Sequence, residues 1–302
     1  MATAPTRPIV VSNRLPYVIQ REGEHYHAVP GSGGLIAALL PVLRGMGGAW
    51  IGWSGTSGDD EGVQQALDEA SDGRFSMHAI ALSQEEIDHF YHGFSNEIIW
   101  PLFHDLASLC NFVPAYWQTY LQVNRRYART VFDHASPSSF VWVHDYQLMH
   151  VGAELRRLGH AGPIAYFLHI PFPPVDLFLQ LPWRRAIVRA LADYDLLGFQ
   201  TLRDRRNFLQ CLQALIPDVS VSGRGQVVNV RIGERTLRVG HFPIGIDYAG
   251  VAGAAASEAV AERVRELQNL LPDRTLILGV DRLDYTKGLP LRLQAFRNAL
   301  QR

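Results

Sequence analysis

Polar, titratable side chains follow directly after apolar strand-like runs at two places in this chain of 302 residues. The run Ile164–Leu168 leads into His169 and then into a proline-rich stretch that a central strand tolerates poorly. The run Phe140–Val143 likewise stops at His144 and Asp145. Ligands bind at the carboxyl edge of an open parallel sheet, so we predict that His169 and Asp145 line a ligand site. A buried, hydrogen-bonded histidine and a helix-capping aspartate are the alternatives.

The chemistry expected of Asp145 is the acceptance of hydrogen bonds from substrate hydroxyl groups. A metal site is not indicated, because His144 and Asp145 are adjacent and adjacent side chains of an extended chain point to opposite sides. The neighbouring acidic pair Asp59–Asp60 lies among Gly and Ser residues, which favours a solvated turn over a metal site.

Two cations, Arg282 and Lys287, lie between the apolar run Thr275–Val280 and the helix-like segment Leu289–Leu300. The N-terminus of a helix favours anions, an arginine can chelate two phosphate oxygens, and a lysine adds a point charge. The arrangement favours a diphosphate clamp, with two ordinary surface cations as the alternative.

Glycine-rich and aromatic segments could add further contacts. The turn Pro30–Leu35, which includes Gly34, precedes a predicted helix at Ile36–Leu43, and such a turn lets the backbone approach an anion. It is not the GxGxxG dinucleotide fingerprint. Tyr91 and Trp100 carry polar tips on flat rings of the kind that line sugar sites, although both could simply belong to the core.

The elements that position these residues alternate between strands and helices, which predicts a doubly wound α/β fold. Strands are expected at 8–14, 48–53, 75–82, 140–143, 164–168, 194–199, 241–246 and 275–280. A small polar hairpin or loop is expected at 21–27, and a hairpin at 227–239. Helices are expected at 36–43, 83–91, 114–132, 148–158, 183–192, 201–214, 258–271 and 289–300. The small, loop-like segment Asp247–Ser257 is the predicted domain boundary.

Composition limits the classes of partner. The net charge of -1 gives no bulk attraction for nucleic acid or anionic membrane, and 47% hydrophobic residues suit a globular core. No apolar run reaches the ~18 to 20 residues of a membrane span, and the first residues lack the apolar core of a signal peptide. Two cysteines do not suggest a disulfide framework, so we expect a cytoplasmic protein.

The ordered series of motifs from Ile9 to the chain end resembles the trehalose-6-phosphate synthase family, whose members are retaining glycosyltransferases with two Rossmann-like domains, the GT-B architecture. The resemblance is carried by the motifs at 11–14, 33–35, 50–55, 91–101, 143–146, 167–172, 193–200, 243–246 and 281–288. It implies transfer of glucose from UDP-glucose to glucose 6-phosphate, in which the acceptor hydroxyl attacks on the face that UDP leaves.

On the acceptor side, the resemblance implies that Arg14 binds the phosphate of glucose 6-phosphate with help from Tyr91 and Trp100. Asp145 would hold acceptor hydroxyls. Asp145 is one of four residues to which the resemblance gives a catalytic role, and the other three lie on the donor side.

On the donor side, the resemblance places Gly34 by the phosphates of UDP-glucose, Trp53 near the cleft and His169 at the donor glucose. Arg282 and Lys287 would neutralise the diphosphate, where cleavage of the glucose–phosphate bond releases negative charge. His169, Arg282 and Lys287 are therefore expected to be catalytic. No metal or other cofactor is required, and no pair of catalytic carboxylates is evident.

The resemblance also divides the chain. Residues 1–247 are predicted to form the Rossmann-like acceptor-side domain, and residues 248–302 a linker with the first strand and helix of the nucleotide-sugar domain. Family members continue well beyond this point, so we expect a fragment with little activity alone.

Other readings stay open at this stage. A related synthase could use another phosphorylated acceptor, such as glycerol 3-phosphate, and a non-catalytic synthase-like subunit could bind sugar phosphates. An unrelated dinucleotide oxidoreductase is disfavoured by the absent GxGxxG fingerprint. Neither the donor nucleotide nor a homo-oligomeric state can be read from the sequence.

Overall fold

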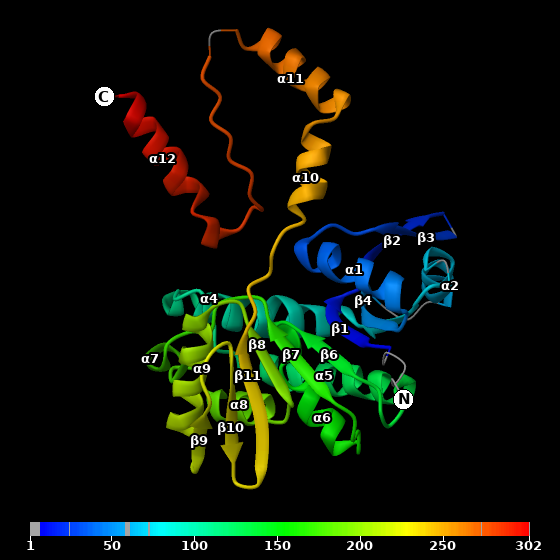
Figure 1. Cartoon of the computed structure of the whole chain (residues 1–302), viewed down its shortest axis with the longest axis vertical. Helices are drawn as coiled ribbons and strands as arrows, with labels where there is room; N and C mark the ends of the chain where they lie inside the picture. Colours follow the sequence, from blue (N-terminus) through cyan, green and yellow to red (C-terminus); the bar gives the residue numbers. More distant parts are fainter. Residues whose placement is uncertain (1–6, 24, 58–60, 72, 273, 302) are drawn as a thin grey trace. The chain divides into compact units, whose positions relative to one another are not determined.

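The computed structural model describes residues 7–23, 25–57, 61–71, 73–272 and 274–301 (Figure 1). The predicted turn at Asp59–Asp60 lies outside these residues. Contacts between Cα atoms divide the chain into two compact units, Met1–Pro243 and Ile244–Arg302. The predicted boundary after residue 247 lies close to this division, and the assignment of the two units as separate domains stays a prediction.

The first unit is built on one large sheet. Its strands are β1 Ile9–Arg14, β4 Ala49–Ser57, β5 Ser76–Leu82, β6 Val141–His144, β7 Ile164–Leu168, β8 Leu196–Phe199, β9 Val219–Ser222, β10 Val227–Ile232 and β11 Arg235–His241. Among the described residues they pair in the order β5-β4-β1-β6-β7-β8-β11-β10-β9. The ladder is parallel from β5 to β11, and β10 and β9 continue it antiparallel. The predicted α/β fold with a Rossmann-like sheet is confirmed.

The helices predicted for this unit are present. Its described helices are α1 Gly34–Met46, α2 Glu61–Ala70, α3 Gln84–Glu86, η1 Ile87–Ile99, α4 Trp100–Phe103, η2 Ala107–Leu109, α5 Pro114–His134, η3 Tyr146–Leu148, α6 Val151–Arg157, α7 Val175–Phe178, α8 Arg184–Leu191 and α9 Leu202–Leu215. Of these, α2, α4 and α7 are additional helices that were not predicted. The predicted polar hairpin is longer than expected and consists of β2 Tyr17–Glu22 and β3 His25–Pro30.

Alternate residues of each strand enter two different cores, because successive side chains of a strand point to opposite faces. In β1, Ile9 and Val11 pack into the larger core against η1, α5, α6, α8 and α9, while Val10 packs into a smaller one. The smaller core is formed by α1, α2 and the β2–β3 hairpin. Burial on both faces explains why these strands read as unbroken apolar runs.

An apolar groove lies on β6, β7 and β8, on the face of the sheet that carries the smaller core. The groove has a volume of about 440 Å³ and is lined by Phe140, Trp142, Ala165, Tyr166, Phe167, Leu196, Gly198 and Phe242. A Cβ at Gly198 would lie 2.6 Å from the Phe167 ring, so the absence of a side chain there lets the ring pack closely against the strand.

The helix opened by Ser83 contains a departure from the prediction. Ser83 and Glu86 form the expected capping box, but the helix continues from Ile87 to Ile99 with π-helical geometry. Gly93 lies against the Tyr116 ring, which a Cβ would approach to 2.7 Å. π-Helical segments are rare and occur frequently at functional sites, and this one carries Tyr91.

Two predictions for the residues around the division between the units are wrong. The strand predicted at 241–246 is not formed: β11 ends at His241, and residues 242–246 belong to no ladder. Residues 247–257 are not a loop but contain α10 Tyr248–Ala255, whose alanines favour a helix and whose N-terminus is capped by the Asp247 carboxylate. The short edge strand β9 was not predicted.

The second unit consists of α10, α11 Glu258–Leu270, the turn η4 Tyr285–Lys287 and α12 Leu289–Leu300. The predicted buried strand Thr275–Val280 is wrong: residues 274–280 form no ladder, and Leu278 is 86% exposed. A strand needs a neighbour to pair with, and none of the described residues of this unit supplies one. In the described part of the chain, no helix combines the length and apolar composition needed to cross a membrane.

Candidate functional site

Arg14 lies at the carboxyl end of β1 and stacks on two aromatic rings. Its Cζ atom is 4.0 Å from the centroid of Trp53 and 5.5 Å from that of Tyr91, and the two rings meet edge to face. The Arg14 side chain is exposed, and within the described residues it forms no ion pair or hydrogen bond. A cation held this way presents its N–H groups to an anion in solution.

The backbone below Arg14 is fixed by buried hydrogen bonds. The Tyr127 hydroxyl donates to the carbonyl of Asn13 at 2.9 Å and accepts from the main-chain N–H of Trp53 at 3.1 Å. The Ser12 hydroxyl donates to the carbonyl of Arg14 at 2.6 Å. Burial raises the pKa of Tyr127 well above its usual range, so this hydroxyl stays neutral.

Gly55 makes room for the guanidinium. It has a φ of 94°, and a Cβ at this position would collide with Nη1 of Arg14. A glycine is required on both counts, since φ in this range strains any other residue. The predicted contact of Trp53 with UDP-glucose stays untested; Trp53 is 2% exposed and its observed neighbours include Arg14 and Tyr91.

Asp145 follows β6 in a strained backbone conformation. Its φ of 73° and ψ of 167° fall in a region that is almost exclusive to glycine. The main-chain N–H of Asp145 donates to the carbonyl of Phe167 at 2.8 Å, and its carboxylate accepts from the main-chain N–H of His169 at 3.2 Å. Strain of this kind clusters at functional sites, which supports Asp145 as a binding residue.

His169 pairs with His144, a contact that the sequence did not predict. The Nδ1 atom of His144 lies 3.1 Å from the Nε2 atom of His169. Burial lowers the pKa of His169 to about 4, and burial together with the neighbouring His169 lowers the pKa of His144 well below its usual range. Both imidazoles are therefore neutral near pH 7.

The buried neutral histidines give a pH dependence of stability. His150, in the large core, also has a pKa lowered to about 4 by burial. Below about pH 6.5 the unfolded chain binds protons that the folded chain does not, so we expect stability to fall from there to about pH 4, by up to about 3 kcal/mol per histidine. Urea unfolding at several pH values measures this loss.

A His150→Leu variant provides the comparison for that measurement. The variant removes one of the titrating groups, so its unfolding free energy should depend less steeply on pH, by about one proton. An unchanged slope in the variant would show that carboxylates, not buried histidines, cause the acid sensitivity.

Trp100 lies beside the loop that follows Asp145. Its ring is 5.6 Å from that of Tyr146, whose hydroxyl donates to Oδ1 of Asn96 at 3.0 Å. The π-helix and α4 thus bring Tyr91 to the Arg14 cluster and Trp100 to the Asp145 loop. Gly34 is the first residue of α1, and a Cβ there would meet nothing within 4 Å. Its predicted contact with phosphates stays a prediction.

The two cations of the second unit occupy a capped turn before α12. The Asp284 carboxylate accepts from the N–H and the hydroxyl of Thr286 and lies 3.9 Å from the Arg282 guanidinium. Lys287 ends the turn, and the left-handed residue Gly288 leads into the helix. The predicted diphosphate clamp stays a prediction.

The structure therefore brings together Arg14, Trp53 and Tyr91 in one cluster and Asp145, His144 and His169 in another. Both clusters lie where parallel strands β4, β1, β6 and β7 end. His144 was missed as a partner of His169. The signal that could have found it is the strand period of two, which places the side chains of His144 and Trp142 on the same face. Among the residues described, no group of three or more His, Cys, Asp or Glu side chains is arranged to hold a metal.

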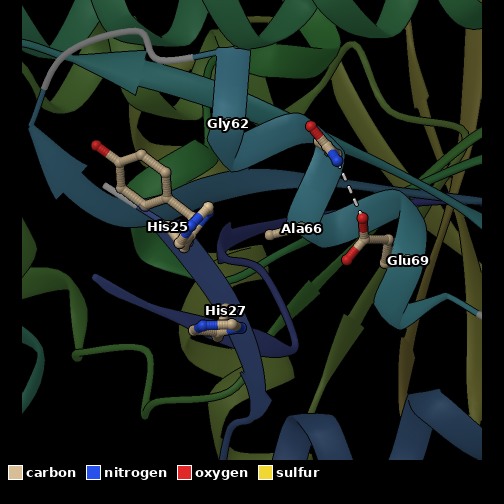
Figure 2. A pocket seen from close by; sticks show the side chains of 7 residues that line it. His25, His27, Gly62, Ala66 and Glu69 are labelled. Atoms are coloured by element: carbon tan, nitrogen blue, oxygen red, sulfur yellow. Dashed lines mark hydrogen bonds between the residues drawn. The ribbon is translucent and has the colours of Figure 1, made fainter. Parts of the chain in front are cut away.

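A separate pocket of about 190 Å³ lies between β3 and α2. Figure 2 shows His25 and His27 beside the helix that carries Gly62, Ala66 and Glu69. Glu69 accepts a hydrogen bond from Gln65 at 3.1 Å. The lining contains none of the predicted site residues.

Comparisons with known proteins agree with the resemblance in the sequence. Residues 6–302 match the profile of glycosyltransferase family 20. The trehalose-6-phosphate synthase of Mycobacterium sp. (strain JLS) is 41% identical over 97% of this chain and 61% of its own length. The enzyme of that name from Mycobacterium tuberculosis (strain CDC 1551 / Oshkosh) is 41% identical over 97% of this chain and 60% of its length. The chain thus spans about three fifths of the length of these relatives.

Two solved structures are similar over 98% of this chain. The first is an alpha,alpha-trehalose-phosphate synthase (UDP-forming) from Burkholderia xenovorans in complex with glucose-6-phosphate, with a TM-score of 0.82, 33% identity and 62% of that chain covered. The second is a structure from E. coli bound with UDP-2-fluoro glucose, with a TM-score of 0.82, 33% identity and 61% of that chain covered.

Proposed function

This chain belongs to glycosyltransferase family 20, and we propose that it forms the acceptor-binding part of an enzyme that makes trehalose 6-phosphate. The reaction transfers glucose from UDP-glucose to glucose 6-phosphate with retention of configuration. The fold is of the GT-B type, with a Rossmann-like N-terminal domain. The observation that carries the proposal is the Arg14 guanidinium, held on Trp53 and Tyr91 at the sheet edge that also carries Asp145.

On the acceptor side, Arg14 binds the phosphate of glucose 6-phosphate through its planar fork of N–H donors. Tyr91 and Trp100 bound the same region, and Asp145 accepts hydrogen bonds from the sugar hydroxyls. The glucose 6-phosphate in the Burkholderia xenovorans structure supports this choice of acceptor. A glycerol 3-phosphate acceptor would share the phosphate contact but would use the sugar-binding residues poorly.

On the donor side, neutral His169 contacts the glucose of UDP-glucose, and Gly34 approaches its phosphates. The UDP-2-fluoro glucose in the E. coli structure supports a UDP-sugar donor. As the glucose–phosphate bond breaks, negative charge develops on UDP, and Arg282 and Lys287 stabilise it without a metal. The acceptor hydroxyl attacks the same face, and the leaving phosphate accepts its proton.

The location we propose is the cytoplasm. Cys110 and Cys211 are both free thiols, as expected of a reducing compartment. Burial raises the pKa of Cys110 to about 11 and that of Cys211 to about 12, so neither thiol is ionised at neutral pH.

Calorimetric titration of this chain with glucose 6-phosphate, glycerol 3-phosphate and glucose tests the acceptor assignment. Glucose 6-phosphate should bind more tightly than either of the other two, because only it engages both Arg14 and Asp145. UDP release from UDP-glucose, measured with and without glucose 6-phosphate, then asks whether this chain catalyses the transfer. Failure of a folded sample to bind glucose 6-phosphate would refute the proposal.

A further inference from the structure

His144 and His169 meet on one face of the sheet, at the carboxyl ends of two neighbouring strands. In the β6–β7 register Trp142 pairs with Ala165 and His144 with Phe167, so these side chains share a face. His169 follows two residues after Phe167 and lies with its ring beside it, at a centroid distance of 4.7 Å. The two imidazoles approach through one nitrogen each, Nδ1 of His144 and Nε2 of His169, 3.1 Å apart.

A hydrogen bond at this distance requires one proton between the two nitrogens. If His144 carries it on Nδ1, then His169 accepts at Nε2 and must carry its own proton on Nδ1. If His169 carries it on Nε2, then His144 must carry its own proton on the opposite nitrogen, Nε2. The two arrangements therefore give the Nδ1 atom of His169 opposite hydrogen-bonding roles. It is a donor in the first arrangement and an acceptor in the second.

The surroundings of His144 favour the first arrangement. His144 is 1% exposed, and its Nε2 atom is buried with no hydrogen-bond partner among the described residues. The second arrangement would leave a buried N–H donor without an acceptor there, whereas the first leaves only a lone pair. A buried donor without a partner is the rarer and costlier of the two.

We propose that His144 is a positioning residue, which donates its Nδ1–H to Nε2 of His169 and thereby holds His169 as the neutral tautomer with its proton on Nδ1. His169 then meets a sugar hydroxyl oxygen as a hydrogen-bond donor. This last step rests on the proposed function, in which His169 contacts the donor glucose. Burial keeps both rings neutral, with the pKa of His169 lowered to about 4, so that the tautomer does not depend on pH near neutrality.

The tautomer can be read directly from the 302-residue chain without any substrate. Nuclear magnetic resonance of the chain labelled with ¹⁵N at its 12 histidines distinguishes protonated from bare ring nitrogens. The ¹⁵N ring signals that disappear in a His169→Gln variant are those of His169, which assigns them. Near neutral pH we expect a protonated Nδ1 and a bare Nε2 at His169.

Substitutions at His144 distinguish a hydrogen bond that it donates to His169 from packing of its ring against His169. Asparagine places an amide N–H donor where the imidazole Nδ1 stood, so His144→Asn should keep the proton of His169 on Nδ1. Aspartate places only an acceptor there, so His144→Asp should move that proton to Nε2. His150→Asn, which changes another buried histidine, is the matched control and should leave the His169 signals unchanged.

Two results would overturn the proposal: a wild-type His169 protonated on Nε2, or an unchanged His169 tautomer in a folded His144→Asp variant. The control of His169 by His144 is independent of activity, so a chain that binds no sugar but shows the tautomer switch refutes only the proposed function. Where UDP release is measurable, it should fall about 10- to 100-fold in His144→Asp, the effect of a mismatched buried hydrogen bond, and much less in His144→Asn. Equal activity in the two variants would mean that the tautomer does not matter for transfer.

Discussion

Replacing Arg14 by alanine is expected to weaken the binding of glucose 6-phosphate to this chain by about 100-fold. A hydrogen-bonded contact to a charged group contributes about 1.5–3 kcal/mol, and a bidentate arginine–phosphate contact lies at the upper end. The guanidinium is already held on Trp53 and Tyr91, so little side-chain entropy is lost when the phosphate binds. Isothermal titration calorimetry of wild-type and variant chains measures the change.

The chain offers a matched control for this substitution. Arg21 also lies over an aromatic ring, that of Tyr26 at 5.7 Å, but it belongs to the β2–β3 hairpin. Arg21→Ala should leave the affinity unchanged, and Arg14→Lys should restore part of it, because lysine keeps the charge but not the fork. The role assigned to Arg14 fails if Arg14→Ala and Arg21→Ala bind glucose 6-phosphate equally well.

Replacing Asp145 is expected to reveal a conflict between stability and binding. Glycine adopts the observed backbone conformation freely and alanine does not, so Asp145→Gly should be more stable than Asp145→Ala by about 1–3 kcal/mol. Both variants lack the carboxylate and should therefore lose glucose 6-phosphate binding to a similar extent, by about 10-fold or more.

The comparison of the two variants isolates the effect of backbone strain on the free energy of unfolding, because each variant loses the same hydrogen bond to the main-chain N–H of His169. Urea unfolding gives the stability difference and calorimetry gives the affinities. Equal stabilities would mean that residue 145 is not strained. Retained affinity in either variant would show that the Asp145 carboxylate does not bind the acceptor.

Much of the fold could be predicted because buried parallel strands leave a local signature. The strands predicted at 140–143 and 164–168 read as short apolar runs that stop at polar residues. The structure has β7 at the predicted bounds and β6 one residue later, at Val141–His144. The same signature indicated Asp145 and His169 as edge residues, since parallel strands end at one edge of the sheet. The order of the strands in the sheet was not needed for that prediction.

Contacts that depend on strand order could not be predicted in this way. The pairing of His144 with His169, and the stacking of Arg14 on Trp53, join neighbouring strands whose adjacency no local pattern encodes. The apolar run at residues 275–280 fails for a related reason: hydrophobicity shows that a segment can be a strand, but only a ladder partner makes it one. The packing of η1 against α5 is likewise a contact between elements that no local pattern encodes.

The position of β1 inside the sheet, between β4 and β6, has a consequence for how the chain folds. Val11 pairs on one side with Ile51 and on the other with Val143, which is synthesised far later. A growing chain can therefore place β1 against β4 early, but it cannot enclose β1 until β6 has left the ribosome. Such non-local parallel pairing slows folding, because a long loop must close before the contact forms. The strand that carries Arg14 remains a sheet edge through much of synthesis, the stage at which an unpaired edge is open to aggregation.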